Sequence, residues 1–414
     1  MGRVRVVLPD RETVGDIVQE HAGAALFKVA HGNKETTWQP SHRAIRVLAS
    51  APVADTPQIV ELTTAPPTGR MVAATTAISQ GDIVFSAPAF SVVLAQAHAQ
   101  THCHQCFAKL RGSVVQCGSC QRARYCDRGC MQQHFGLHDA ACDALLHLDV
   151  LPADFDLVRL ALACVVMEIA LNNPSVITGL TIHAVVSKET KRYAKYAALL
   201  LKHLPPLDRP EWLHVSHITD VFVALRFNAH PIVVDLHSSA LGLGIFPDAA
   251  RMINHACRPT TFPTYNRQTR ALNFRAVESL APGALVTYSY LDVFGFGLLE
   301  PRSARHRVLA TTFGFECNCG RCAEGDNDAT TTLTPCDKLL AQLDDAVQRH
   351  QWPLVVAVAS QLLAEWQAQR LPTAYPLVYL LHTKIATACR QMNVSDTVAR
   401  EAAANAAALC GFAS

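Results

Sequence analysis

The sequence contains no long hydrophobic segment and no long run of basic residues. The longest apolar run, Leu160 to Met167, has eight residues, whereas a membrane-spanning helix needs about 20. We expect a buried helix there and no membrane role. Charged residues make up 17% of the chain and the formal net charge is +2, which argues against tight nucleic-acid binding through phosphates. Half of the residues are hydrophobic, as in a globular protein of about two to four domains.

A disulfide framework is also disfavoured, although the chain has 15 cysteines. The odd number leaves one thiol unpaired, no signal peptide is expected ahead of the cysteines, and a chain of 414 residues needs no disulfide staples. We therefore expect reduced thiols and a location in the cytoplasm, the nucleus or both.

Cysteine and histidine pairs are concentrated between residues 103 and 142. The pairs are Cys103-x2-Cys106, Cys117-x2-Cys120, Cys126-x3-Cys130 and His138-x3-Cys142. Zinc takes four soft or borderline ligands at tetrahedral corners, and a C-x2-C pair presents two thiolates from one turn. Eight ligands predict two closed structural sites, and the bound metal would supply the folding free energy that forty residues cannot gain from a core.

Two zinc ions shared by four pairs usually alternate in a cross-brace. We assign one ion to Cys103, Cys106, Cys126 and Cys130, and the other to Cys117, Cys120, His138 and Cys142. His134 competes with His138 for the histidine position. The spacing resembles the MYND zinc finger, whose eight-residue step from the sixth cysteine selects His138. That resemblance implies an interaction module for short proline-containing peptides.

A second group of motifs follows in the second half of the chain. In order, these are Gly-Leu-Gly-Ile-Phe-Pro at 242–247, Asn-His-Ala-Cys-Arg-Pro at 254–259, the segment 281–290 ending at Tyr290, and the C-x-C-x2-C of Cys317, Cys319 and Cys322. Together they resemble the SET methyltransferase domain with its post-SET cysteines. The domain's start is seen in Gly-Arg-Met-Val-Ala-Ala at 69–74.

A SET domain interrupted by a MYND finger and a helical insert resembles the SMYD methyltransferases. The resemblance implies an α+β protein: a β-rich SET fold with an inserted zinc finger, a helical insert, a zinc-bearing post-SET segment and a tetratricopeptide-like C-terminal helical region. The expected parts are an N-terminal extension at 1–62, the first part of SET at 63–100, the finger at 101–142, the insert at 143–225, the SET core at 226–298, the post-SET segment at 299–325 and the helical region at 335–414.

A third zinc site is expected between distant segments. Cys257 supplies a lone thiol after the Asn-His pair, and Cys317, Cys319 and Cys322 arrive sixty residues later. Four thiolates complete a tetrahedron, and the ion would hold the post-SET segment beside the Asn-His strand.

The resemblance also implies the chemistry of the site. S-adenosylmethionine would donate a methyl group to a neutral lysine amine, and an apolar channel favours that neutral form. Tyr290 and Phe313 would line the channel. The residues implied to contact the donor are Gly69, Arg70, Asn228, Asn254, His255, Tyr290 and Phe315. For Asn228 and Phe315, roles in a turn and in the core are the alternatives.

Several residues depart from the SET pattern. Met71 replaces a glycine, Thr260 an asparagine, and Ala284 and Leu285 an acidic residue. Phe313 stands where a second channel tyrosine is expected. Its missing hydroxyl would loosen the channel toward higher methylation states or reduce turnover.

The two ends of the chain are predicted from local patterns. Short strands at 24–29 and 43–48 and a hairpin turn at 31–34 predict a small β module, or else extra strands on the SET sheet. Helices are predicted at 337–350, 354–369, 374–391 and 396–409, with Ser395 or Asp396 capping the start of the last one and Gly411 its end.

Two functions from different classes remain at this point. The first is a monomeric protein-lysine methyltransferase that acts on a histone or non-histone protein. The second is a scaffold or transcriptional co-regulator whose finger and helices bind partners while the SET pocket has weak or no activity.

Overall fold

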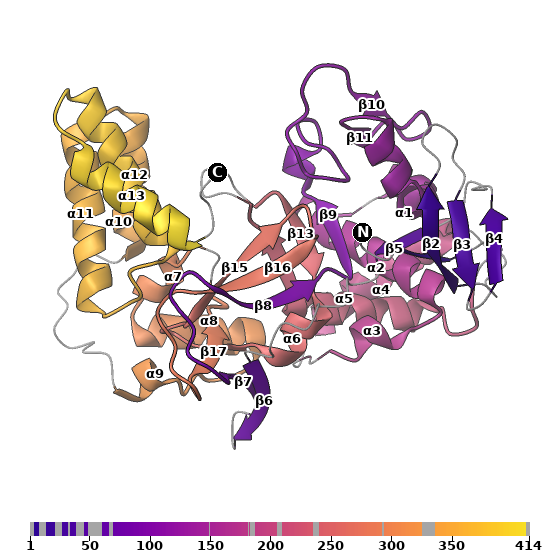
Figure 1. Ribbon diagram of the computed structural model, residues 1–414, viewed down its shortest axis with the longest axis horizontal. Coiled ribbons are helices and arrows are strands. Elements are labelled where there is room, and N and C mark those ends of the chain that lie inside the picture. Colours follow the sequence, from indigo (N-terminus) through magenta and orange to yellow (C-terminus); the bar gives the residue numbers. More distant parts are fainter. Residues whose placement is uncertain are drawn as a thin grey trace.

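The computed structural model describes residues 4–7, 14–20, 27–31, 34–38, 45–48, 60–65, 69–148, 150–180, 182, 187–204, 209–234, 240–291, 294–324 and 336–410. Small β-sheets occupy the centre of the molecule in Figure 1. The N-terminal sheet and the first helices lie on one side of them, and the C-terminal helices lie on the other.

The N-terminal residues form one antiparallel sheet with the order β4-β3-β2-β1-β5. Its strands are β1 Val4–Val7, β2 Val14–Glu20, β3 Phe27–His31, β4 Lys34–Trp38 and β5 Ile45–Leu48. β3 pairs antiparallel with β4, with His31 opposite Lys34; the central residues of the predicted hairpin turn, 32 and 33, lie outside the described residues. The sequence did not predict β4. Among the described residues these five strands pair only with one another, and β5 lies against α1.

Three small sheets form the centre of the molecule, with the orders β12-β13-β9, β14-β17-β7-β6 and β15-β16-β8. Their strands are β6 Val60–Ala65, β7 Gly69–Ala74, β8 Ile83–Pro88, β9 Ser91–Leu94, β12 Ala229–Ile232, β13 Gly242–Ile245, β14 Asn254–His255, β15 Thr261–Asn266, β16 Ala271–Ala276 and β17 Leu285–Tyr288. One apolar core joins all three, with Val92, Phe274 and Tyr288 among its members. The short helix α6, Pro247–Met252, leads from β13 to β14.

The glycine of the Gly-Leu-Gly-Ile-Phe-Pro segment at the start of β13 permits close strand packing. A Cβ atom on Gly242 would lie 2.2 Å from the carbonyl oxygen of Val93 on β9. Such a contact is impossible without moving the backbone, so only glycine fits there.

The helical insert packs around a core of its own. Its elements are α2 Phe155–Leu171, α3 Ser175–Thr178, α4 Ser187–His203 and α5 Val215–Asn228, together with the end of α1 Arg128–Leu146, a helix that begins within the predicted finger. The apolar run identified in the sequence lies in α2 and is buried from Leu160 to Met167, as expected for an interior helix.

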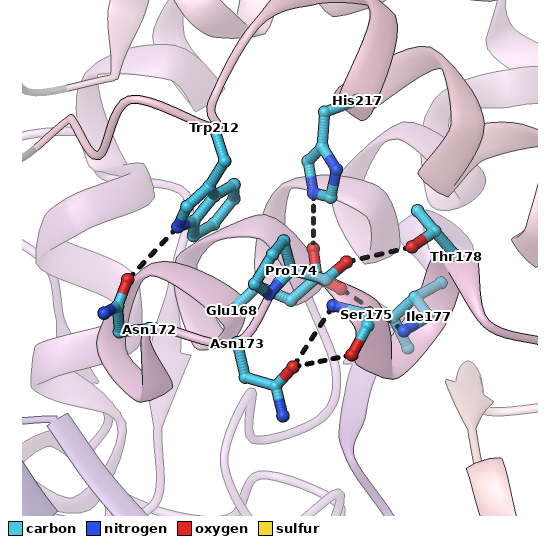
Figure 2. Close-up of polar contacts among 9 residues, drawn as sticks. All are labelled: Glu168, Asn172, Asn173, Pro174, Ser175, Ile177, Thr178, Trp212 and His217. Carbon is cyan, nitrogen blue, oxygen red and sulfur yellow. Dashed lines mark hydrogen bonds and ion pairs between the residues drawn. The ribbon is translucent and has the colours of Figure 1, made fainter.

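Polar side chains fix how α2, α3 and α5 meet (Figure 2). The fully buried Glu168 accepts hydrogen bonds from His217 Nε2 at 2.9 Å and from the Ile177 backbone N–H at 3.2 Å. Trp212 Nε1 donates to Asn172 Oδ1 at 3.1 Å. Burial raises the pKa of the Glu168 carboxyl, so this carboxyl remains in the core only because both oxygens have partners.

The C-terminal helices run close to the predicted ranges. They are α10 Cys336–Gln348, α11 Trp352–Ala368, α12 Pro376–Gln391 and α13 Thr397–Cys410, and Figure 1 shows them grouped at one end of the molecule. A proline at the start of α11 and α12 sets their first turns. The predicted cap Gly411 lies outside the described residues. The preceding helices are α7 Phe296–Leu299, α8 Arg302–Phe313 and α9 Gly320–Glu324.

None of the helices in the described ranges combines the length and the apolar character needed to cross a bilayer.

Candidate active site and metal centres

A cavity of about 1150 Å³ lies between the central sheets and the segment after α8. Six residues predicted for the site line it: Asn228, Asn254, His255, Tyr290, Phe313 and Phe315. They come from the end of α5, from β14, from the segment after β17 and from the end of α8 with its following turn. The cavity thus brings together predicted residues that lie up to 87 positions apart in the chain, and its lining extends from Met71 to Tyr375.

The predicted Gly69 and Arg70 lie in β7, and the next residue, Met71, lines the cavity. β7 pairs with β17 through Val72 opposite Val286. This pairing sets the start of the SET motif against the strand that leads to Tyr290.

The Asn254–His255 pair forms β14, a two-residue strand parallel to β17. Its register places Asn254 opposite Thr287 and His255 opposite Tyr288. The His255 ring lies between two partners: the Tyr290 backbone N–H donates to Nδ1 at 3.0 Å, and Nε2 lies 3.3 Å from Cys257 Sγ. Because Nδ1 accepts, the ring proton is assigned to Nε2, which donates to the sulfur.

Burial lowers the pKa of His255 to about 4. The ring is therefore neutral at physiological pH, as this pair of hydrogen bonds requires. His255 connects the backbone of Tyr290 to a cysteine of the third thiol cluster, a link that goes beyond the donor contact expected from the sequence.

Aromatic rings surround Tyr290. Its ring centroid lies 4.8 Å from that of Tyr288, 5.2 Å from that of Phe313 and 6.3 Å from that of Phe315. The Tyr290 hydroxyl donates to the Ile253 carbonyl oxygen at 2.8 Å. Burial raises the pKa of Tyr290, so this side chain is a neutral phenol near pH 7.

Asn228 is the last residue of α5 and is buried. Its side-chain amide donates to the Ala224 carbonyl at 2.8 Å, so it closes the helix end as well as lining the cavity. The turn role considered for this residue and the cavity role are therefore compatible.

Two positions that depart from the SET pattern, Thr260 and Leu285, have contacts of their own. Thr260 Oγ1 donates to the Leu285 carbonyl at 2.8 Å and accepts from the Thr287 N–H at 2.9 Å. A threonine thus ties the Asn-His segment to β17, where the SET pattern expects an asparagine. Leu285 lines the cavity and is 40% exposed, which accounts for the tolerance of a non-acidic residue there.

The third thiol cluster forms part of the cavity wall. Cys257, Cys317, Cys319 and Cys322 offer ligand atoms that lie within 4.8 Å of one another. Cys257 Sγ is 3.9 Å from Cys317 Sγ and 3.6 Å from Cys322 Sγ, against about 3.8 Å for sulfurs on a zinc tetrahedron. The four residues fit a zinc ion.

Hydrogen bonds among these four thiols shift their pKa values in opposite directions. The hydrogen bond with Cys257 raises the pKa of Cys317 and lowers that of Cys319. A bound cation would instead favour the thiolate form of all four cysteines.

The cysteine-rich segment between residues 103 and 142 brings together the two predicted sets of ligands. One set is Cys103, Cys106, Cys126 and Cys130, and the other is Cys117, Cys120, His138 and Cys142. Cys120 Sγ lies 3.4 Å from His138 Nε2. His134 lies outside both sets, and its Nδ1 instead lies 3.1 Å from the Tyr125 hydroxyl.

Local elements hold these ligands. β10, Val115–Gln116, and β11, Arg124–Tyr125, form a short hairpin, and α1 begins after Asp127, whose carboxylate accepts from the Cys130 N–H at 2.8 Å. The cap sets the first turn that carries Cys130.

Two of the cavity-wall residues that sequence reasoning missed have contacts that bear on the site. The Tyr288 ring lies against the Tyr290 ring at an interplanar angle of 55°. The buried Arg321 donates to the carbonyl oxygens of Cys257 at 2.9 Å and Leu298 at 2.8 Å and to Gln369. Arg321 therefore links the third thiol cluster to the C-terminal helices. Its position inside the C-x-C-x2-C motif was the only signal available.

The fold and these centres are those of a SET domain protein with cysteine-rich metal sites. The SET domain family matches residues 69–291, more than half of the chain, and the chain belongs to this family. Relatives that carry SMYD names match this chain over about 63–65% of its length.

Three relatives illustrate the similarity. "N-lysine methyltransferase SMYD2-B" of Danio rerio is 30% identical over 65% of this chain and 61% of its own length. "N-lysine methyltransferase SMYD2" of Mus musculus is 30% identical over 63% and 59%, and "Histone-lysine N-methyltransferase Smyd1" of Mus musculus is 26% identical over 65% and 56%. The chain thus spans about three fifths of the length of these curated relatives.

Among solved structures, "Crystal structure of the SET domain of LSMT bound to Lysine and AdoHcy" matches 64% of this chain and 54% of that chain. The match has 13% identity and a TM-score of 0.30, a value that supports no detailed comparison.

Proposed function

We propose that the protein is an S-adenosylmethionine-dependent protein-lysine N-methyltransferase. The observation that carries the proposal is the convergence of Asn254, His255 and Tyr290 with the rings of Phe313 and Phe315 in one cavity. The named lysine methyltransferases among the relatives support the same reaction.

The residues present fit the methyl donor. The cavity of about 1150 Å³ exceeds the roughly 300–1000 Å³ of a typical small-molecule site, so it has room for a nucleoside-sized donor together with a lysine side chain. Asn228, Asn254 and the β7 backbone from Gly69 would hold the donor, and Phe315 offers a ring for its adenine.

The chain's own residues would prepare the lysine amine. When bound, S-adenosylmethionine supplies a methyl group on a positively charged sulfur. The rings around Tyr290 exclude water and disfavour the ammonium form of an entering lysine, since burial lowers its pKa. Tyr290 keeps its own proton and donates it to Ile253, which leaves its oxygen lone pairs to accept an amine N–H and orient the nitrogen.

His255 is a positioning residue in this scheme. It accepts from the Tyr290 backbone and donates to Cys257, so an ion bound by the third thiol cluster would fix where Tyr290 lies. The three sets of thiol ligands would hold three structural zinc ions.

Two further parts complete the proposal. Residues 101–142 would act as a MYND finger that binds proline-containing peptides, and the tetratricopeptide-like helices from residue 335 would cover one side of the cleft for a histone or non-histone protein. We place the protein in the cytoplasm or nucleus, where reduced thiols such as the free cysteines of these clusters persist. We expect it to act as a monomer.

Calorimetric titration of the zinc-loaded protein with S-adenosylmethionine tests the donor site. We expect micromolar binding that Asn254→Ala removes and that the matched control Asn405→Ala, an exposed position on α13, leaves intact. His255→Ala should also remove binding, but by displacing Tyr290, so its zinc content and circular dichroism need to be recorded.

A scaffold role is the second candidate, and the missing hydroxyl at Phe313 and missing acidic group at Ala284 favour it. If the wild-type protein retains its zinc and its fold but binds no donor, the enzyme proposal fails and the scaffold stands. If it binds the donor, the search for a substrate lysine begins.

A further inference from the structure

A fourth cluster of metal-ligating side chains lies outside the cavity and outside the three thiol sets. Asp143 and His147 lie at the end of α1, and His203 is the last residue of α4. Their ligand atoms lie within 4.8 Å of one another. His203 Nδ1 is 3.0 Å from Asp143 Oδ2, and His147 Nδ1 is 3.5 Å from Asp143 Oδ1.

These separations suit a transition-metal ion. Ligands at about 2.0–2.1 Å from a tetrahedral zinc are about 3.4 Å apart, and the two printed nitrogen–oxygen distances bracket that value. Two imidazoles and one carboxylate are also a donor set that zinc accepts, with water in the fourth position.

The two imidazole rings stack almost parallel, with centroids 4.4 Å apart and an interplanar angle of 6°. One cation bound by the three side chains would hold both rings in this arrangement. His147 Nδ1 lies 2.9 Å from the Asp143 backbone carbonyl oxygen, a contact that metal binding through Nδ1 would replace.

The backbone favours a cation at the same point. The C-terminal ends of α1 and α4 converge there, and each helix end carries partial negative charge on its last carbonyl groups. Two positively charged side chains disfavour a cation at this point. They are the exposed Lys202 and Arg209, whose guanidinium donates to the Leu204 carbonyl at 2.7 Å.

We propose that Asp143, His147 and His203 form an accessory site for a divalent transition-metal ion of the zinc type. The ion would clamp α1, which carries His138 and Cys142 of the second set, to α4, because Asp143 directly follows Cys142 in α1. Asp143 and His147 are 62% and 52% exposed, so the side chains have room to close around an ion, and the fourth ligand position faces solvent.

Cobalt titration tests this site directly. Protein whose thiol sets are filled with zinc would be titrated with Co²⁺ while the absorption spectrum and the metal content are recorded. We expect one further equivalent to bind with visible bands of a nitrogen and oxygen site and without the near-ultraviolet bands of cobalt–thiolate bonds. His203→Gln and Asp143→Asn should each weaken this binding at least about tenfold.

The control is His214→Gln, which changes an exposed histidine at the start of α5 in the same insert and should bind cobalt as the wild type does. The proposal is overturned if the wild-type protein takes up no further equivalent, if the further equivalent shows thiolate bands, or if both variants bind it with unchanged affinity. Because the wild-type titration is itself decisive, a variant that folds poorly leaves the test intact.

Discussion

The cysteine-rich insert and the C-terminal helices are held together by different means. In the insert the buried cluster consists of Cys103, Cys120, Ala123 and Tyr125, so half of it is metal-ligating sulfur. The C-terminal helices share a broad apolar core in which Leu362 and Trp366 are almost completely buried. The comparison teaches that one region would depend on bound metal for its folded state, whereas the other depends on apolar burial.

Removing the bound metal should produce the largest difference in stability between the two regions. In the presence of a strong chelator and a reductant, we expect residues 103–142 to unfold while α11 and α12 remain folded. The reason is that structural zinc supplies about 10–16 kcal/mol of folding free energy in small metal domains. Hydrogen exchange measured by mass spectrometry should show rapid exchange in the insert and continued protection in the helices, and zinc should restore the insert. Continued protection of the metal-free insert would contradict this.

A cavity created by mutation in the apolar core should destabilise the C-terminal helices and leave the metal sites unchanged. Leu362 in α11 is fully buried, so Leu362→Ala should lower the free energy of unfolding of the C-terminal region by about 2–5 kcal/mol. The zinc content should not change. Urea denaturation monitored by circular dichroism, beside metal analysis, checks both statements.

The matched control is Val398→Ala in α13, where the side chain is 81% exposed and the effect should stay within about 0.5 kcal/mol. Equal losses in the two variants, or loss of zinc from Leu362→Ala, would show that the regions are not organised as described.

The same distinction explains what could be predicted from the sequence. The ligand pairs of the cysteine-rich segment follow from spacing, because each pair lies within one turn of chain, whereas their grouping into two sets and the choice of His138 came from the usual cross-brace and from the resemblance to the MYND finger. The C-terminal helices follow from apolar periodicity and from prolines such as Pro353 and Pro376 at their starts. Both signals are local.

The features that escaped prediction depend on distant pairing. β14 has two residues and takes its register from β17, about thirty positions later, and no local pattern specifies such a strand. His203 meets Asp143 only because α1 and α4 end at the same place. Of the site, Asn254, His255 and Tyr290 could be placed through the order of family motifs, whereas the role of Arg321 required the structure.

Acidification should affect the cavity region through His230. Burial lowers the pKa of this β12 side chain to about 4, from 6.5 in the unfolded chain. The unfolded state therefore binds more protons between these values, so the contribution of His230 is complete above pH 6.5 and is lost as pH falls toward 4. The loss amounts to roughly 3 kcal/mol.

Denaturation curves of wild type and His230→Gln between pH 7 and pH 4 measure this effect as a difference. The variant should lose less stability over that range than the wild type, whereas the exposed control His214→Gln should follow the wild type. Zinc content recorded at each pH separates this contribution from protonation of the thiol ligands. Parallel curves for wild type and His230→Gln would refute it.

The smallest effect is expected at Phe313, in the aromatic part of the cavity wall beside the part formed by the third thiol cluster. Phe313 ends α8, and its ring centroid is 5.2 Å from that of Tyr290, close enough for a new hydroxyl to act on the same amine. On the proposed methyltransferase function, Phe313→Tyr should restrain that amine or a water molecule and shift the products toward fewer methyl groups. The rate should change by up to about tenfold, equivalent to about 1.4 kcal/mol. Mass spectrometry of a methylated peptide, with Phe155→Tyr at the start of α2 as the control, measures both quantities. If the product distribution and the rate both equal those of the wild type, the missing hydroxyl has no role in the reaction, and the metal-supported wall through His255 becomes the main determinant of how the amine is held.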